Sequence, residues 1–172
     1  MNIRGLSLVF LVSDCFPKRN CIMSHWTASL FASGMEAISK SQSNGKGALA
    51  AAIFSIIRYP IKAIAAFVVA PFLVFRVARY AKNPIRRGVA TVGLFMAVLS
   101  AWVAGTFLGT LAGGLFVLSK FGPFIAMGFL LGTTLSVILS VAFSMIVLNA
   151  TSWFFLQLSS DDVIAHLKTI SE

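Results

Sequence analysis

Hydrophobic residues dominate one long stretch of the chain, from Val89 to Leu158, which contains a single charged residue, Lys120. Lys120 lies in the segment Ser119–Pro123, where a glycine and a proline interrupt the apolar pattern. The interruption divides the stretch into two arms, Val89–Leu118 and Phe124–Leu158. Each arm is longer than the roughly 18 apolar residues that indicate a membrane-spanning helix. The pattern therefore predicts an all-α membrane protein built on a hydrophobic helical hairpin over residues 89–158.

The arms are too long for a simple crossing. At 1.5 Å of rise per residue they would measure about 45 and 52 Å, whereas the hydrocarbon core of a bilayer is about 30 Å thick. A tilt of about 20° absorbs only a few ångströms of this excess. Two arrangements stay open: the arms cross fully and their ends lie along the interface, or the hairpin dips into one leaflet or a lipid monolayer.

Small residues recur at every fourth position in both arms. The first arm carries Gly93, Ala97, Ala101, Gly105, Gly109 and Gly113, and the second carries Gly128, Gly132, Ser136, Ser140 and Ser144. Helices in lipid associate through close backbone approach, which small residues permit, although a repeat of four drifts around a straight helix. We therefore predict a helix-packing contact nearest the turn, of Gly105, Gly109 and Gly113 against Gly128, Gly132 and Ser136. The same stripe could instead mediate an oligomer.

The segment before the arms, residues 47–88, is apolar but contains basic residues and two prolines, Pro60 and Pro71. A basic group at a helix centre costs at least about 2.5 kcal/mol on insertion scales, so Arg58 and Lys62 argue against a simple span. We predict a kinked basic amphipathic or re-entrant segment, formed by one kinked helix or a pair of short ones at the interface. The alternative is a third transmembrane helix with Arg58 paired to lipid phosphate or to a partner subunit.

The chain is strongly basic, with 14 Lys and Arg against five Asp and Glu and a net charge of +9. Seven basic residues fall within the thirty positions just before the first arm: Arg58, Lys62, Arg76, Arg79, Lys82, Arg86 and Arg87. No stacking platform or docking motif accompanies them, so a nucleic-acid partner is not indicated. Such a cluster beside a membrane helix indicates contact with anionic lipid headgroups. By the positive-inside rule it also places both termini on the cytoplasmic side.

Three further segments flank these elements. Residues 1–22 contain a short apolar run without a good cleavage site, and Met23 opens a more ordinary beginning, so we expect a dispensable extension. Residues 23–46 are polar and predict a short weak helix followed by a flexible link. Residues 159–172 predict a short amphipathic tail helix that lies on the membrane surface or on a partner. Its N-cap is Ser159 or Ser160, and its apolar stripe is Val163, Ile164, Leu167 and Ile170.

The sequence offers no constellation for catalysis. His25 and His166 lie in the polar ends, and the arms contain no ionisable residue except Lys120. A proton or ion path inside a membrane normally requires such residues. Cys15 and Cys21 have no metal-ligand spacing around them. We therefore expect a non-enzymatic protein without a cofactor or metal.

Three runs in the arms resemble the promethin family of lipid-droplet assembly factors. They are Val92-Gly93-Leu94-Phe95, Gly114-Leu115-Phe116-Val117-Leu118 and Ser152-Trp153-Phe154. The resemblance covers residues 89–155 and leaves out the basic segment before the arms. It implies a small, non-enzymatic hairpin protein of the endoplasmic reticulum and lipid-droplet membrane, with seipin as the kind of partner.

Three functions fit these observations. The first is a hairpin that organises membrane lipid at the reticulum or at a droplet surface. The second is a small accessory or assembly subunit of a larger complex in a bacterial or mitochondrial inner membrane. The third is a glycine-zipper oligomeric pore, which would require a more polar lining than these arms supply. The expected partners are membrane lipids with anionic headgroups, together with further copies of the chain or another membrane protein.

Overall fold

The computed structural model describes residues 21–43, 47–81, 87–119 and 125–171. Over these residues the chain is helical almost throughout and has no strand. Its elements are α2 (Cys21–Ser43), α3 (Ala48–Arg58), α4 (Pro60–Val77), the 3-10 turn η3 (Ala78–Tyr80), α5 (Arg87–Ser119), α6 (Ile125–Leu156) and α7 (Ser160–Ser171). Most of the expected extension at residues 1–22 lies outside the described residues, as do Lys82, Arg86 and Lys120.

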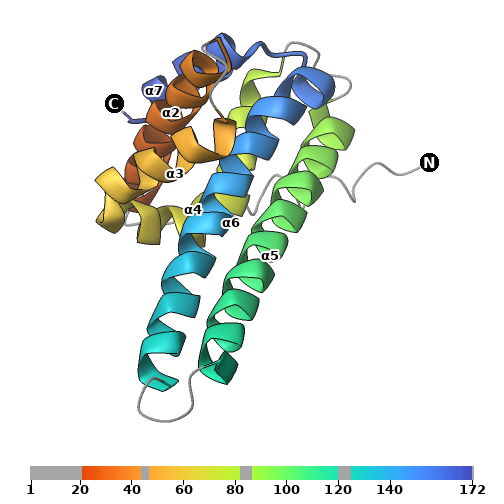
Figure 1. The fold of residues 1–172 in the computed structure, drawn as a ribbon. Coiled ribbons are helices and arrows are strands. Elements are labelled where there is room, and N and C mark those ends of the chain that lie inside the picture. The colour runs from red at the N-terminus through yellow and green to blue at the C-terminus, as the bar shows by residue number, and fades with distance from the viewer. Residues whose placement is uncertain (1–20, 44–46, 82–86, 120–124, 172) are drawn as a thin grey trace, which may run out of the picture.

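The two apolar arms form α5 and α6, which lie side by side along the molecule (Figure 1). Among the residues that the structure describes, three helical segments are long and apolar enough to cross a membrane: Pro60–Tyr80, Arg87–Leu118 and Ala126–Leu156. The prediction of an all-α chain with long apolar helices, compatible with a membrane protein, is therefore confirmed. The third such segment, α4 with η3, lies in the stretch for which the sequence left two interpretations open.

The basic segment before the hairpin is a pair of helices. Pro60 is the first residue of α4, and Tyr59 before it has φ −134° and ψ 67°, which ends α3. A proline disfavours the helical conformation in the residue that precedes it and tolerates the first turn of a new helix. Pro71 lies inside α4 without ending it. Because Pro71 has no N–H, the carbonyl of Phe67 loses its usual helical donor.

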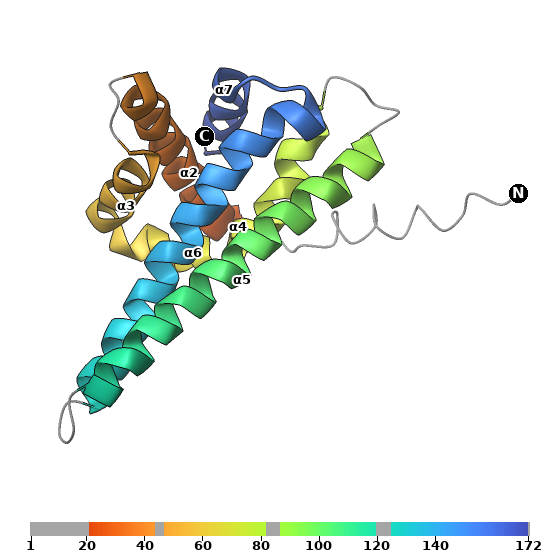
Figure 2. The ribbon, with the colours of Figure 1, turned by 45° about the vertical axis from the view of Figure 1, so that its right-hand side comes forward.

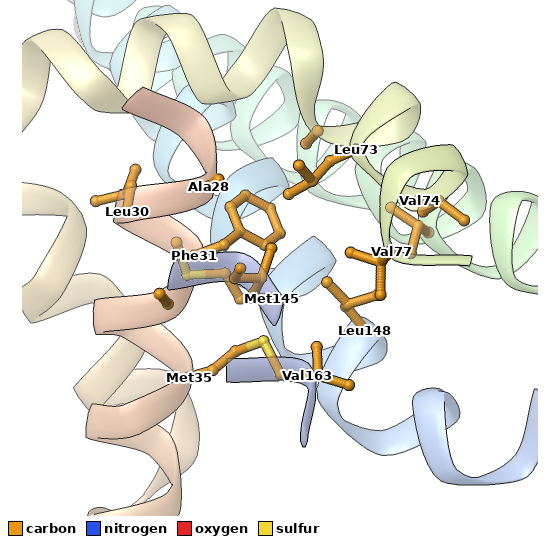
Figure 3. Close-up of a cluster of buried hydrophobic side chains, with 14 of the residues drawn as sticks. Ala28, Leu30, Phe31, Met35, Leu73, Val74, Val77, Met145, Leu148 and Val163 are labelled. Atoms are coloured by element: carbon orange, nitrogen blue, oxygen red, sulfur yellow. The ribbon is translucent and has the colours of Figure 1, made fainter. Parts of the chain in front are cut away.

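The N-terminal segment is more ordered than its composition indicated. We expected a short weak helix, but α2 has 23 residues and completely buries Ile38. It also completely buries Ala28, Phe31 and Met35 (Figure 3). These residues recur at helical spacing, so they form one apolar face. The serines between these residues make the segment polar on average, so its composition does not reveal the apolar face. α2 packs against α3, α4, α6 and α7, and it supplies a large part of the core.

The C-terminal helix α7 has the expected cap. The Ser159 hydroxyl accepts a hydrogen bond from the Asp162 N–H at 3.1 Å, and the Asp162 carboxylate accepts one from the Ser159 N–H at 3.0 Å. This reciprocal pair satisfies donors that would otherwise lack partners at the helix start. Val163 and Leu167 are fully buried against the chain's own helices. The expectation that this stripe lies on the membrane or on a partner is therefore wrong for these residues, because α2 covers them.

The helices gather around one end of the hairpin and leave its other end bare. Figures 1 and 2 show α2, α3, α4 and α7 around the end of α5–α6 that is farther from the turn. The core lies there, where Phe31 and Met35 of α2 meet Met145 of α6 and Val163 of α7 (Figure 3). We call this end the bundle. Beyond it the hairpin continues as two helices alone.

Candidate membrane interface

The level at which the bundle ends follows from two contacts between α4 and α5. The Trp102 indole N–H donates to the Phe67 carbonyl at 2.8 Å, and the Phe75 and Phe95 rings lie 5.0 Å apart. From the first contact to the second, the residue number rises from 67 to 75 in α4 and falls from 102 to 95 in α5. The two helices therefore run antiparallel. Continuing this register places Pro60, the first residue of α4, level with about residue 110 of α5. The Trp102 indole N–H also replaces the helical donor that the Phe67 carbonyl lacks because residue 71 is a proline.

The register of α6 against α5 confirms the same level. A Cβ at Gly105 would lie 2.4 Å from Ser140 Cα, and a Cβ at Gly109 would lie 2.3 Å from Ser136 N. Residue 110 therefore faces about residue 135. From Ala126 to Leu135 every residue of α6 is exposed except two glycines, Gly128 and Gly132. We call the two-helix end formed by residues 110–118 and 126–135 the prong.

The surface of the prong is apolar. Its exposed large side chains are Leu111, Leu115, Leu118, Met127, Phe129, Leu130, Leu131 and Leu135. Its three hydroxyl groups donate to carbonyls of their own helices: Thr110 to Phe107 at 2.9 Å, Thr133 to Leu130 at 3.0 Å and Thr134 to Leu130 at 2.9 Å. Polar groups satisfied within a helix are what a hydrocarbon environment requires. The described part of the prong therefore presents a surface suited to lipid.

Small residues lie where α5 and α6 approach most closely. A Cβ at Gly113 would lie 2.5 Å from Gly132 Cα and 2.8 Å from the Gly128 carbonyl oxygen. Gly109 lies against Ser136, whose hydroxyl donates to the Thr106 carbonyl of the facing helix at 3.2 Å. The structure thus brings five of the six predicted contact residues together across the helix pair. The sixth, Gly105, lies against Ser140, one step farther along the same stripe of small residues.

Two of the seven predicted lipid-contact residues lie near the level at which the prong begins. The Arg58 guanidinium and the Lys62 ammonium lie 5.6 and 5.1 Å from the centre of the Tyr59 ring. Lys62 also donates to the Ser29 hydroxyl of α2 at 3.0 Å. Since Tyr59 separates α3 from α4, the two basic side chains belong to different helices. We call Arg58, Tyr59 and Lys62 the elbow.

The other described basic residues of that set lie at the far end of α4 and the start of α5. Arg76 is half-buried, Arg79 is exposed, and the Arg87 guanidinium donates to the Arg79 carbonyl. Arg76 is 14 residues beyond Lys62, a rise of about 21 Å along the helix. The predicted lipid-contact set therefore separates into two levels. Only the elbow lies near the level at which the prong begins.

The polar helices α2 and α7 lie on the other side of α6 from α5 (Figure 1). Glu36 of α2 pairs with Lys40 at 2.9 Å and with Lys168 of α7 at 3.4 Å. The hydrogen bond from Lys40, together with the charge of Lys168, holds the pKa of the Glu36 carboxyl below its ordinary value. Such a network of exposed charges belongs in water or among headgroups. The bundle therefore has a polar side, which the prong lacks.

One face of α4 is apolar and uncovered. Its residues Ile61, Ile64, Val68 and Phe72 are each between 50 and 70% exposed. They recur at helical spacing, and they are part of the bundle instead of the prong. This stripe was not identified from the sequence, because an apolar segment with two prolines gives no indication of which face its neighbours cover.

Within the residues that the structure describes, no group of three or more His, Cys, Asp or Glu side chains could hold a metal ion. Comparisons with protein-family models, with curated proteins and with solved structures found no match for this chain.

Proposed function

We propose that this chain is a non-enzymatic integral membrane protein whose apolar hairpin enters and organises lipid. The observation that carries the proposal is the prong, an exposed apolar helix pair whose hydroxyl groups are already satisfied. Full burial of a side chain such as Leu, Phe or Met is worth about 1.5–3 kcal/mol. The eight large side chains of the prong are between 36 and 71% exposed, so their transfer into lipid would supply roughly 8 kcal/mol.

The glycines of the hairpin support insertion as a helix pair. Lipid provides no hydrophobic force between two apolar helices, so their association depends on close packing. The contacts of Gly109 with Ser136 and of Gly113 with Gly132 provide backbone approach of that kind. A glycine-lined pore is not proposed, because these glycines already contact the neighbouring helix of the same chain.

The location that we propose is the cytoplasmic face of a lipid surface, with both termini cytoplasmic. The described basic residues of the segment before the hairpin all belong to the bundle, which favours a cytoplasmic bundle and headgroup contact. The resemblance to the promethin family extends the proposal to the endoplasmic reticulum and lipid droplets, with a seipin-like partner. A protein of this kind would act by occupying and ordering lipid around the hairpin.

The experiment is flotation of the purified full chain with phosphatidylcholine vesicles and with phospholipid-coated triolein droplets. The prong variant carries Leu115→Lys and Phe129→Lys. The matched control, Leu49→Lys, changes an exposed apolar residue of the bundle. We expect the wild-type chain and the control to float with both lipid surfaces, and the prong variant to stay in the soluble or aggregated fraction. Equal flotation of the prong variant would refute the proposal.

The second candidate, an accessory subunit of a membrane complex, is favoured by the uncovered stripe on α4. Ile64, Val68 and Phe72 form a face on which an apolar helix of another protein could pack. The test is quantitative co-purification from the native membrane with Val68→Asn as the variant. A partner that is recovered in a fixed ratio with the wild-type chain and lost from the variant would support this role over the lipid-organising one.

A further inference from the structure

We infer that the hairpin enters only one leaflet, and that the phosphate level of the membrane lies at the elbow, Arg58–Tyr59–Lys62. This inference rests on the proposed function, because it specifies the depth and the lipid contact of an inserted prong. Three independent features bear on it: the length of the prong, the position of the basic side chains, and the donors that remain on those side chains.

The length of the prong matches one leaflet. The elbow is level with about residue 110, and α5 ends at Ser119, so the helix pair extends about 14 Å beyond the elbow. The hydrocarbon core of a bilayer is about 30 Å thick, or about 15 Å per leaflet. Exposure on α6 changes at the same level, since the fully exposed run ends at Leu135. On the bundle side of this level α5 still exposes apolar side chains such as Val92 and Val103, but α6 is covered by other helices. The length over which both helices of the pair are uncovered is therefore that of a single leaflet.

The position of the charges also favours one leaflet. A full crossing would require about 20 residues of each arm in hydrocarbon, up to about residue 99 of α5. Arg58 and Lys62 would then lie about 15 Å deep, together with the Ser29 hydroxyl that Lys62 contacts. Insertion into one leaflet instead keeps the Arg58 and Lys62 side chains at the headgroup level. Each basic group in hydrocarbon is costly, so the shallower position is favoured for the elbow.

The elbow has the chemistry to bind a phospholipid phosphate. A guanidinium offers paired N–H donors that match two oxygens of a phosphate. The Lys62 ammonium uses one of its three donors on Ser29, which leaves two for a ligand. Tyr59, between them, is a residue type that is enriched at membrane interfaces. The occupant that we assign to the elbow is a headgroup phosphate of the leaflet that the prong enters.

This assignment changes what is expected of the other basic residues. Arg76 and Arg79 lie about 20 Å or more above the elbow, measured along α4. At that height they are beyond two Debye lengths of the phosphate level at physiological ionic strength. They contribute little to binding at the lipid surface, although they belong to the same basic segment. They therefore provide a matched pair of control substitutions.

Depth is tested with single cysteines in the full chain, after Cys15→Ser and Cys21→Ser, in vesicles of phosphatidylcholine with 30% phosphatidylglycerol. A fluorophore is attached at Leu111→Cys or Leu118→Cys and quenched by lipids brominated at different depths. We expect bromines near the headgroup to quench the label at 111 most strongly, and bromines near the acyl-chain ends to quench the label at 118. A membrane-impermeant thiol reagent enclosed in the vesicles should not react with Ser119→Cys.

Two other outcomes are distinguishable. If the enclosed reagent reacts with position 119 and the label at 111 lies near the bilayer centre, the hairpin crosses fully; the inference is then wrong and the proposed function stands. If no brominated lipid quenches either label, the prong does not insert and the proposed function itself fails.

The phosphate contact is tested by comparing quenching of the label at 111 by brominated phosphatidylglycerol and brominated phosphatidylcholine. We expect phosphatidylglycerol to be enriched around the wild-type prong by about threefold or more. The double variant Arg58→Gln/Lys62→Gln should lose this enrichment, whereas Arg76→Gln/Arg79→Gln should keep it. Equal loss in both double variants would show that the phosphate level does not lie at the elbow.

Discussion

The hydrogen bond from Trp102 to Phe67 offers the sharpest test of how the bundle is fastened to the hairpin. Because Pro71 has no N–H, the Phe67 carbonyl has no helical donor within α4, and the Trp102 indole donates to it at 2.8 Å. We predict that Trp102→Phe destabilises the protein by about 1–3 kcal/mol, the cost of leaving a part-buried acceptor without a partner. The rings of Trp102 and Phe67 also pack together, with centres 5.1 Å apart, and we expect a phenylalanine at position 102 to retain this contact.

The same substitution should be milder when α4 can satisfy its own carbonyl. In a Pro71→Ala background the new N–H can donate to Phe67, so Trp102→Phe should cost less than about 1 kcal/mol. The four proteins form a double-mutant cycle, with an expected coupling energy of about 1 kcal/mol or more. The assay is equilibrium unfolding in mixed detergent micelles, followed by far-ultraviolet circular dichroism. An equal cost of Trp102→Phe in both backgrounds would refute the reasoning.

Three further predictions concern other contacts. Gly109→Ala should destabilise the hairpin by about 1–3 kcal/mol in the same micelle assay, because the added Cβ would lie 2.3 Å from Ser136 N. The control Gly114→Ala should be neutral or stabilising, because nothing lies within 4 Å of the Cβ that it adds. Ser159→Ala should cost about 1 kcal/mol by removing the α7 cap, measured as a lower unfolding midpoint; no change would mean that the cap is unimportant. Because the pKa of Glu36 is lowered in the folded protein, its contribution to stability is fully present above the ordinary pKa of 4.5 and is lost as the pH falls through the lowered pKa. Glu36→Gln should therefore flatten the pH dependence of unfolding below pH 4.5.

The sequence predicted the hairpin because its signal is local. An apolar run of thirty residues without charge has few alternatives to a long helix, whatever surrounds it. α2 was underestimated for the opposite reason. Its apolar face, with Phe31 and Met35, becomes significant only when α6 and α7 pack against it, and the intervening serines dilute the pattern. The stripe of α7 was visible in the sequence, but nothing local indicates that α2 covers it.

The candidate interface was predictable only in its parts. The spacing of Gly109 and Gly113 indicated which side of α5 could pack closely, but it did not indicate the register, which brings Gly105 to Ser140. The basic residues were identified as one set. Their separation into two levels depends on how α4 lies along α5, which is determined by the contact of Trp102 with Phe67. Long-range contacts of this kind leave no periodic signal in a single sequence.

In the arrangement that we propose, lipid surrounds the prong, and water or headgroups surround the bundle. Spin labels placed one at a time along the exposed face of α5, from Val89 to Leu118, would test it most directly by their collisions with oxygen and with a water-soluble nickel chelate. We predict that, along α5 toward Leu118, collisions with oxygen rise and collisions with nickel fall within one turn of residue 110. Oxygen collisions should stay high, and nickel collisions low, as far as Leu118. A lipid-like response that begins at Val89, or a water-like response at Leu115, would contradict this arrangement of the prong in lipid and the bundle outside it.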